Sequence, residues 1–243
     1  MPITGSWKSL NFDKRAGGAR PSMIIIHYTG MRSEDEALHR LCDPDTKVSS
    51  HYFINENGES LNLVEDSMRA WHAGISYWDG ITDINSHSIG IELVNPGHEF
   101  GYHPFPPKQM NALANLCTRL MDRYGIKPIN VIGHSDIAPK RKQDPGELFP
   151  WRQLATQRIG FWPHLKDTDY SAAEDVLAEE QLFHELLVEY GYNPDVSFKN
   201  LISAFHRHFY PEKFIAGDSP EAPDSTSAAK LLALVREKNS NKT

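Results

Sequence analysis

The chain has 243 residues, of which 40% are hydrophobic and 23% are charged. This composition is typical of a globular protein with one sizeable core, alone or with a small second domain, and it excludes extensive disorder. The formal net charge of −7 argues against nucleic acid as a partner, because holding its backbone needs many Lys and Arg side chains. Any basic site must therefore be local.

The compartment is predicted from cysteine usage and from the lack of long apolar segments. Cys42 and Cys117 are too few for a disulfide framework and are expected to be buried thiols. No stretch approaches the roughly 18 apolar residues of a membrane helix, and the first residues do not form a signal peptide. We expect a soluble chain, cytoplasmic if this N-terminus is native and periplasmic if a leader was removed. Oligomeric state is left open, with a monomer favoured.

Apolar patterns predict the elements of the first half. The run "SMIIIHYTG" predicts a buried strand over residues 23–29. A short amphipathic helix is expected over 34–44, followed by a hairpin over 51–64 that turns at an Asn-Gly pair. The segment "HSIGIELV", residues 87–94, predicts a second interior strand.

The next segments predict a helix and a third strand. Residues 106–125 place apolar side chains at helical spacing, with prolines before them and a glycine after them. A strand is expected before His134, and a short helix within 145–160. We predict an α/β fold with a central mixed β-sheet flanked by helices, in which strand ends gather ligands.

The C-terminal part has a different pattern. Residues 161–175 are polar and predict a connection. Three helices are expected after it, over residues 173–191, 197–210 and 228–238, with a Pro/Ser/Asp-rich linker over 217–227. The sequence therefore predicts two domains, 1–168 and 169–243, the second a small all-α domain near the lower size limit for independent folding.

Two histidines and one aspartate suit a metal ion. His27 and His134 each lie at a predicted strand end, and Pro145 restricts Asp144 to an extended conformation. Two neutral imidazoles and one carboxylate leave a tetrahedral Zn²⁺ with an open position for water, which is typical of catalytic zinc. We predict one Zn²⁺ per chain at this site. An ordinary strand histidine is the alternative for His27 taken alone.

Hydrolysis needs a base and a cation as well as a metal. Glu92 is the candidate base because it lies in an apolar strand, where a lone carboxylate is costly to bury. Lys142 is the candidate oxyanion cation, since in an extended segment it projects to the same side as Asp144. A solvated sheet face for Glu92 and plain surface charge for Lys142 stay open as alternatives.

Several short segments together resemble a known family. They occur in the order "IIIHYTG", "SSHYFINENG", "AWHAG", "NSHSIGIELVN", "VIGHSDIAPKRKQDPG" and "FPW". This set closely resembles the zinc-dependent N-acetylmuramoyl-L-alanine amidases, whose type 2 amidase fold is shared with peptidoglycan-recognition proteins. The resemblance spans residues 20–163 and implies a mixed sheet with helices packed around it.

The resemblance implies an activity and a set of roles. The reaction would be hydrolysis of the amide between N-acetylmuramic acid, or its 1,6-anhydro form, and L-alanine of the stem peptide. Zinc would be held by His27, His134 and Asp144, with Glu92 acting on the attacking water and Lys142 stabilising the tetrahedral intermediate. Phage and animal relatives have Cys in place of the aspartate ligand and a Tyr where this chain has Ser50. Both differences place the chain with the bacterial branch that uses aspartate and glutamate.

Other residues in these motifs are predicted to contact substrate. By resemblance, five lie on or beside the groove: His51, Tyr52, Trp71, His72 and Asn85. Plain core positions are the alternative for Tyr52 and Trp71. Arg141, within a cluster of cations, is expected to meet stem-peptide carboxylates.

The helical tail, with "YGYNP" and "AFHRHFYP", resembles the three-helix peptidoglycan-binding domain of some of these amidases. A packing or dimerisation role is the alternative. For the whole chain, two other functions compete with the amidase: a muropeptide-recognition module without activity, and an Fe(II) oxygenase with a facial triad. The first is disfavoured because all the predicted ligands and catalytic groups are present, and the second because of the ligand order.

Overall fold

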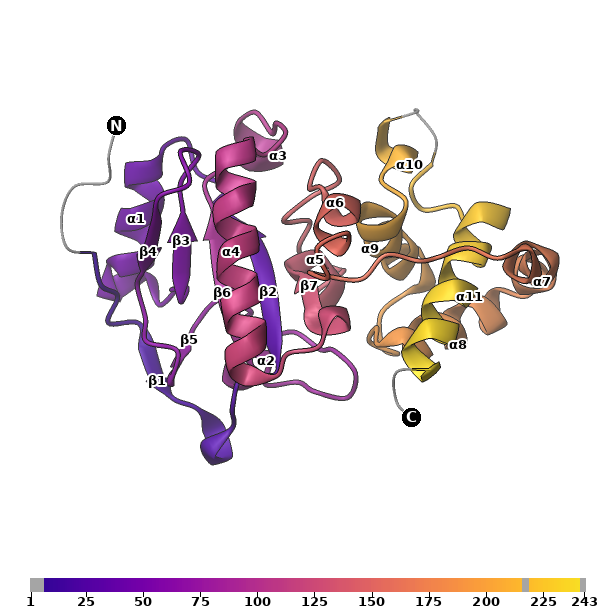
Figure 1. Ribbon diagram of the computed structural model, residues 1–243, viewed down its shortest axis with the longest axis horizontal. Coiled ribbons are helices and arrows are strands. Elements are labelled where there is room, and N and C mark those ends of the chain that lie inside the picture. The colour runs from indigo at the N-terminus through magenta and orange to yellow at the C-terminus, as the bar shows by residue number, and fades with distance from the viewer. Residues whose placement is uncertain (1–6, 216–218, 241–243) are drawn as a thin grey trace.

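A five-stranded mixed sheet lies at the centre of the computed structural model, which describes residues 7–215 and 219–240 (Figure 1). Its strand order is β4-β3-β6-β2-β7, with β4 antiparallel to β3 and the others parallel. The strands are β2 (Met23–Tyr28), β3 (Tyr52–Ile54), β4 (Ser60–Asn62), β6 (Ser88–Leu93) and β7 (Val131–Gly133). The predicted fold class, strands and hairpin are confirmed.

Alternation along β2 explains how the sheet is covered. Ile24 and Ile26 pack with helix α4 (Pro107–Tyr124) in one buried cluster, whereas Met23 and Ile25 belong to another cluster on the opposite face. His27 follows the same alternation and lies on the face of Ile25, as the sequence predicted.

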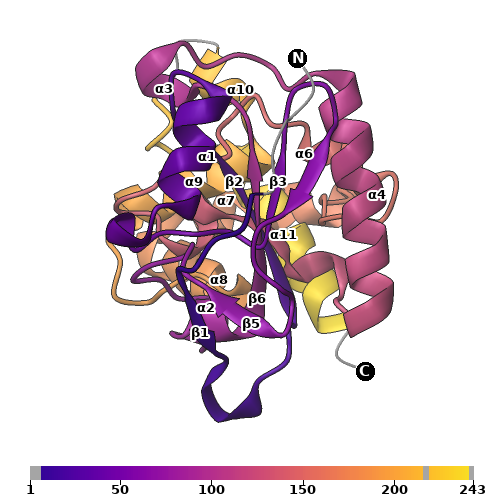
Figure 2. The same ribbon diagram turned by 90° about the vertical axis from the view of Figure 1, so that its left-hand side faces the viewer.

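Helices cover both faces of the sheet (Figure 2). Helix α4 begins at a proline and ends before Gly125, whose φ of 68° forms the C-cap. Helix α1 (Glu34–Cys42) starts after Ser33, whose hydroxyl accepts a hydrogen bond from the N–H of Glu36, and packs on Phe53. Helix α4 packs with Ile54 of β3, whereas α1 packs with the adjacent residue Phe53. Since successive side chains of a strand point to opposite faces, the two helices lie on opposite faces of the sheet.

The C-terminal part differs from the prediction in its helices. They are α7 (Asp167–Ala178), α8 (Glu180–Tyr190), α9 (Phe198–Phe209), α10 (Glu212–Ile215) and α11 (Ser225–Ser240). The expected polar connection is wrong from Asp167 onward, because the Asp169 carboxylate accepts the Lys166 N–H at 2.7 Å and caps a helix. The helix expected over 173–191 is split where Glu179 becomes extended.

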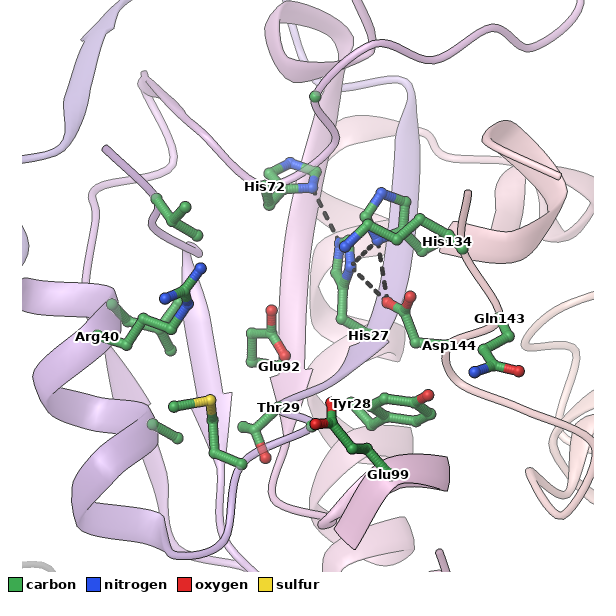
Figure 3. A pocket seen from close by; sticks show the side chains of 18 of the residues that line it. His27, Tyr28, Thr29, Arg40, His72, Glu92, Glu99, His134, Gln143 and Asp144 are labelled. Carbon is green, nitrogen blue, oxygen red and sulfur yellow. Dashed lines mark hydrogen bonds and ion pairs between the residues drawn. The ribbon is translucent and has the colours of Figure 1, made fainter. Parts of the chain in front are cut away.

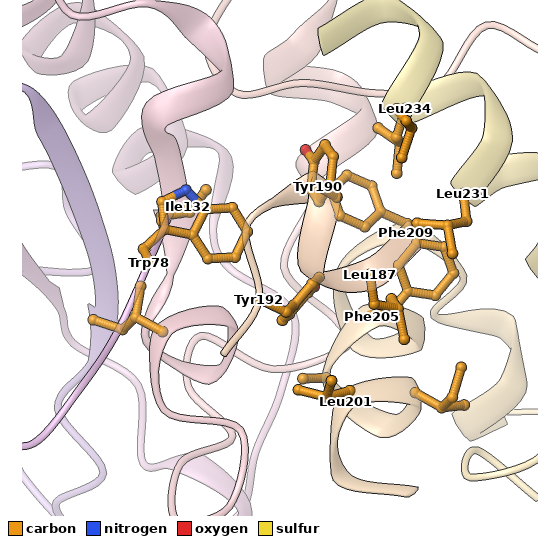
Figure 4. Close-up of a cluster of buried hydrophobic side chains, with 14 of the residues drawn as sticks. Trp78, Ile132, Leu187, Tyr190, Tyr192, Leu201, Phe205, Phe209, Leu231 and Leu234 are labelled. Atoms are coloured by element: carbon orange, nitrogen blue, oxygen red, sulfur yellow. The ribbon is translucent and has the colours of Figure 1, made fainter. Parts of the chain in front are cut away.

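One buried cluster joins the sheet to these helices. Ile132 of β7, Trp78 and Tyr192 pack in it with Leu201 of α9 and Leu234 of α11 (Figure 4). The division into residues 1–168 and 169–243 stays a prediction, and the side chains on its two sides share this core.

Smaller elements complete the chain. A two-stranded sheet pairs β1 (Phe12–Lys14) with β5 (Met68–Ala70), and the remaining elements are α2 (Ile84–His87), α3 (Gly97–Phe100), α5 (His134–Ile137), α6 (Trp151–Ala155) and short 3₁₀ turns at Ala16–Gly18, Pro44–Thr46 and Pro128–Asn130. Cys117 is buried and Cys42 half-buried, both as free thiols. The first residues of the predicted linker, 217 and 218, and the start of the N-terminal segment lie outside the described residues.

Within the described part of the chain, none of the helices combines the length and apolar character that crossing a membrane requires.

Candidate metal centre and active-site cavity

Three neighbouring parallel strands bring the predicted groups to one edge of the sheet. Glu92 of β6 is directly paired in register with His27 of β2. On the other side of β2, strand β7 ends at Gly133, and His134 is the first residue of α5. The parallel arrangement places the strand ends together, so these side chains lie side by side (Figure 3).

The three predicted ligands converge on one point. His27 Nδ1 lies 2.9 Å from His134 Nδ1, and each nitrogen lies 3.0 Å from Asp144 Oδ2. All three residues are buried. The Ser135 N–H donates to the Asp144 carbonyl at 2.9 Å, which folds the loop back onto the strand end. The predicted grouping is confirmed as one that could hold a metal ion.

The protonation states in this cluster suit a cation. Burial lowers the pKa of His27 to about 4, so its imidazole is neutral near pH 7. Burial alone would raise the pKa of Asp144, but the adjacent His134 and His27 outweigh it and hold that pKa below its usual range. A carboxylate and neutral imidazoles are the forms in which these residues bind metals.

A chain of hydrogen bonds assigns the tautomer of His27. The Ser88 hydroxyl donates to the Ile84 carbonyl at 2.7 Å, so it accepts from His72 Nε2 at 3.1 Å. His72 Nδ1 is then an acceptor, and it accepts a hydrogen bond from the N–H of His27 Nε2 at 3.0 Å. This leaves the His27 Nδ1 lone pair directed at His134 and Asp144. His72 therefore orients a ligand.

The ring of His134 is held by Ala73, the residue after His72. Its Nε2 donates to the Ala73 carbonyl at 3.1 Å, which leaves Nδ1 as the ligand atom. Asn85 Oδ1 accepts from the N–H groups of His72 and Ala73 at 3.1 and 2.8 Å, fixing both neighbours of the site. Gly90 is required behind His72, because a Cβ there would lie 2.4 Å from the His72 ring.

Glu92 is half-buried and has one carboxylate oxygen without a partner among the described residues. Within residues 7–215 and 219–240, its Oε2 is buried and has no hydrogen-bond partner. Burial, helped by the charge of Asp144, raises the pKa of Glu92 well above its usual value, while the charge of Lys142 opposes this shift. Glu92 is half-buried and lines the cavity, rather than lying on an open sheet face. Lys142 is exposed and faces the same cavity.

The cavity around these groups has a volume of about 570 Å³ and also contacts Trp71, Asn85 and Arg141. Arg141 Nε donates to the Ile75 carbonyl at 3.0 Å, so its guanidinium holds the cavity wall as well as facing the cavity. Figure 3 shows Arg40 of α1 across the cavity from the three candidate metal ligands. Sequence patterns gave no sign of it, since it is one exposed cation on an amphipathic helix.

His51 and Tyr52 are not brought to the cavity. The His51 ring is buried, with Nδ1 accepting from the Gly90 N–H at 3.0 Å and Nε2 lying 3.1 Å from Arg15. The Tyr52 hydroxyl donates to Asp66 at 2.8 Å. Their positions give no support to the predicted substrate contacts and explain both residues as structural.

A network beside the cavity was missed. Tyr28, next to a metal ligand, has its hydroxyl 2.9 Å from His98 Nδ1, and His98 Nε2 lies 3.0 Å from Glu147. Tyr28 is the last residue of β2, but His98 and Glu147 lie far from it in sequence and at no strand end, so no local pattern indicated the network.

The fold and the site together fit a hydrolase: three residues that could hold a metal ion lie beside a carboxyl group and a cation at one end of a cavity. Comparison with known proteins gives the family. Residues 17–147 match the model of the N-acetylmuramoyl-L-alanine amidase family Amidase_2. The chain belongs to this family and is an N-acetylmuramoyl-L-alanine amidase. The recognition-module and Fe(II) oxygenase alternatives are thereby disfavoured.

Similar proteins extend this result over most of the chain. The amidase AmiD of Escherichia coli is 41% identical over 217 residues, which cover 81% of this chain and 78% of AmiD. The 1,6-anhydro-N-acetylmuramyl-L-alanine amidase AmpD of Haemophilus influenzae is 34% identical and covers 60% of this chain and 87% of its own length.

Solved structures agree. AmiD in complex with anhydro-N-acetylmuramic acid-L-Ala-D-γ-Glu-L-Lys superposes with a TM-score of 0.76 at 38% identity, covering 93% of this chain and 92% of AmiD. AmpDh3 of Pseudomonas aeruginosa has a TM-score of 0.80 at 30% identity and covers 98% of this chain and 99% of its own. These matches include the C-terminal helices.

Proposed function

We propose that this chain is a zinc hydrolase that cleaves the amide between the lactyl group of N-acetylmuramic acid, or its 1,6-anhydro form, and L-alanine of a stem peptide. Support comes from the structures of AmiD and AmpDh3 with anhydro-muramyl peptides. The observation that carries the proposal is the Glu92 carboxyl, which lines the cavity on the strand next to His27 and whose Oε2 is buried without a hydrogen-bond partner in the part of the chain that the structure describes.

Zinc fits the donor set. Two imidazole nitrogens and one carboxylate oxygen meet at hydrogen-bonding distance, and the remaining nitrogens of His27 and His134 are both engaged by hydrogen bonds that orient the rings. When bound, zinc would supply Lewis acidity toward the scissile carbonyl and lower the pKa of water to roughly 7.

The residues of the chain perform the proton transfers. The Glu92 carboxylate accepts a proton as a water oxygen attacks the lactyl carbonyl carbon, and its raised pKa makes it an effective base. Lys142 stabilises the negative oxygen that forms. When the C–N bond breaks, Glu92 returns the proton to the nitrogen of the departing L-alanine. The products are a free carboxylate and a free amine.

The cavity walls position the substrate. Trp71 offers an apolar face with a polar edge, which suits a sugar ring, and Asn85 holds the wall beside it. Arg141 and Arg40 supply positive charge for the carboxylates of the stem peptide. The C-terminal helices are proposed to contact peptidoglycan, and the enzyme to be a monomer, which light scattering would test. The location, cytoplasmic or periplasmic, stays open to cell fractionation.

Zinc analysis followed by mass spectrometry of digested anhydro-muropeptides tests this function. We expect one zinc per chain and release of the intact stem peptide with L-alanine at its N-terminus. Glu92→Gln, which keeps the shape of the side chain, should retain zinc and lose nearly all turnover. A zinc-loaded protein that releases no stem peptide would refute the proposal, and unchanged turnover in Glu92→Gln would remove that residue from the mechanism.

A further inference from the structure

The segment between Gly133 and Glu147 carries most of the proposed chemistry. His134, Lys142 and Asp144 all lie on it, and Lys142 is exposed. What holds this segment is therefore as important as its sequence, because small displacements of catalytic groups have large effects on rate.

One end of the segment is fixed by a buried carboxylate. Asp136 accepts the Gly133 N–H at 2.8 Å and so caps the short helix that begins with His134. The same carboxylate accepts from His208 Nδ1 of α9 at 2.7 Å and from the Tyr192 hydroxyl at 2.8 Å. The side chains of Asp136 and His208 are 1% and 2% exposed, so this hydrogen bond is shielded from solvent.

The other end is held by the residue next to His208. Arg207 Nε lies 3.3 Å from Glu147, just after the segment, and Glu147 in turn contacts His98. The His208 ring is fixed by stacking on Trp151 of α6, with ring centroids 4.0 Å apart. The last turn of α9 therefore contacts both ends of the 133–147 segment, at Asp136 and at Glu147.

We propose that the last turn of α9 is a positioning element for the active site, in which His208 and Arg207 hold the two ends of the 133–147 segment and so place His134, Lys142 and Asp144. The inference rests on the roles proposed above for those three residues. It gives the C-terminal helices a function inside the catalytic unit, whether or not they also bind peptidoglycan.

A pair of substitutions at His208 tests the hydrogen bond. His208→Asn keeps a donor at the position of Nδ1, whereas His208→Leu removes it at similar size. We expect His208→Leu to weaken zinc binding about tenfold, by competition with a chromogenic chelator, to speed hydrogen exchange in residues 133–147, and to lower kcat more than it changes KM. His208→Asn should recover most of each effect. Lys199→Ala, on an exposed side chain of the same helix, is the matched control and should change nothing.

Each result bears on the inference. Equal zinc affinity and equal exchange in His208→Leu and wild type would overturn it, as would equal defects in the Leu and Asn variants. If His208→Leu does not fold, Arg207→Met removes the contact with Glu147 at the other end and keeps an apolar stem, and unchanged exchange over 133–147 in that variant overturns the inference. Hydrogen exchange measured without zinc tests the positioning role of α9 independently of the proposed amidase mechanism. If the wild type is inactive but the variants show the expected exchange pattern, only the amidase mechanism is refuted.

Discussion

His206 provides a quantitative test of how the C-terminal helices contribute to stability. Its ring is fully buried, with Nδ1 donating to the Pro220 carbonyl at 2.7 Å and Nε2 lying 2.6 Å from the Ser227 hydroxyl, which also contacts Asp224. Burial lowers the pKa of His206 to about 4, so the ring is neutral near pH 7. Protonation would place a charge in the core.

The sign and size of the effect follow from linkage. Because the pKa is about 6.5 in the unfolded chain and about 4 when folded, the unfolded state binds more protons between these values, so stability is complete above about pH 6.5 and is lost as pH falls toward 4. Between about pH 7.5 and about pH 5 the loss from His206 is about 2 kcal/mol. Ile132 of β7 and Leu201 of α9 belong to one buried cluster. We therefore expect the sheet and the C-terminal helices to unfold together, so that this loss of stability applies to both.

Urea denaturation of the metal-stripped protein at these two pH values measures the effect. His206→Asn, which keeps a donor toward Pro220 but does not titrate, should show a pH dependence of unfolding free energy smaller by about 2 kcal/mol than wild type. His164→Asn is the control, because that side chain is 87% exposed. An identical pH dependence in His206→Asn and wild type would refute the reasoning.

Three further predictions concern the active site. Gly90→Ala should displace the His72 ring and raise the zinc dissociation constant by roughly 10 to 100-fold, as measured by chelator competition; unchanged affinity would contradict the orienting role. Lys142→Met should lower kcat by roughly 100-fold or more with little change in KM. Lys140→Met is the control, since this residue is exposed and lies outside the cavity, and it should leave both constants unchanged. Equal kinetics in the two variants would exclude Lys142 from stabilising the oxyanion. Tyr52→Phe should cost about 1 kcal/mol of stability in urea and leave KM unchanged, and a raised KM would return this residue to the substrate groove.

Local patterns predicted the candidate metal site because each of its groups has a local signal, although His27 and His134 are 107 positions apart. His27 follows an apolar run whose alternation sets its face, and Glu92 obeys the same rule on the neighbouring strand. Parallel pairing then brings the strand ends together without further information. The ligand trio was therefore predictable from residue types and strand ends.

The positions of His51 and Tyr52 depend on contacts that no local pattern encodes. Their motif lies beside the site in sequence, but β3 has only the residues Tyr52–Ile54, and the hydroxyl and ring are directed to Asp66 and Arg15. These partners lie 14 and 36 positions away, outside the motif. Proximity of a motif to a site does not determine which side of the backbone a side chain occupies.

The C-terminal helices show the same limit on a larger scale. Their helical periodicity was visible, but the link between Asp136 and His208 joins residues 72 positions apart, and Ile132 packs in one cluster with helices that follow residue 167. A chain truncated near residue 168 would expose that apolar face and leave the Asp136 carboxylate without its partner. Loss of activity in such a truncation therefore cannot be assigned to lost wall binding. Substitutions on the exposed surface of α7 to α11, which leave the α9 contacts intact, are the changes that isolate peptidoglycan binding from active-site positioning.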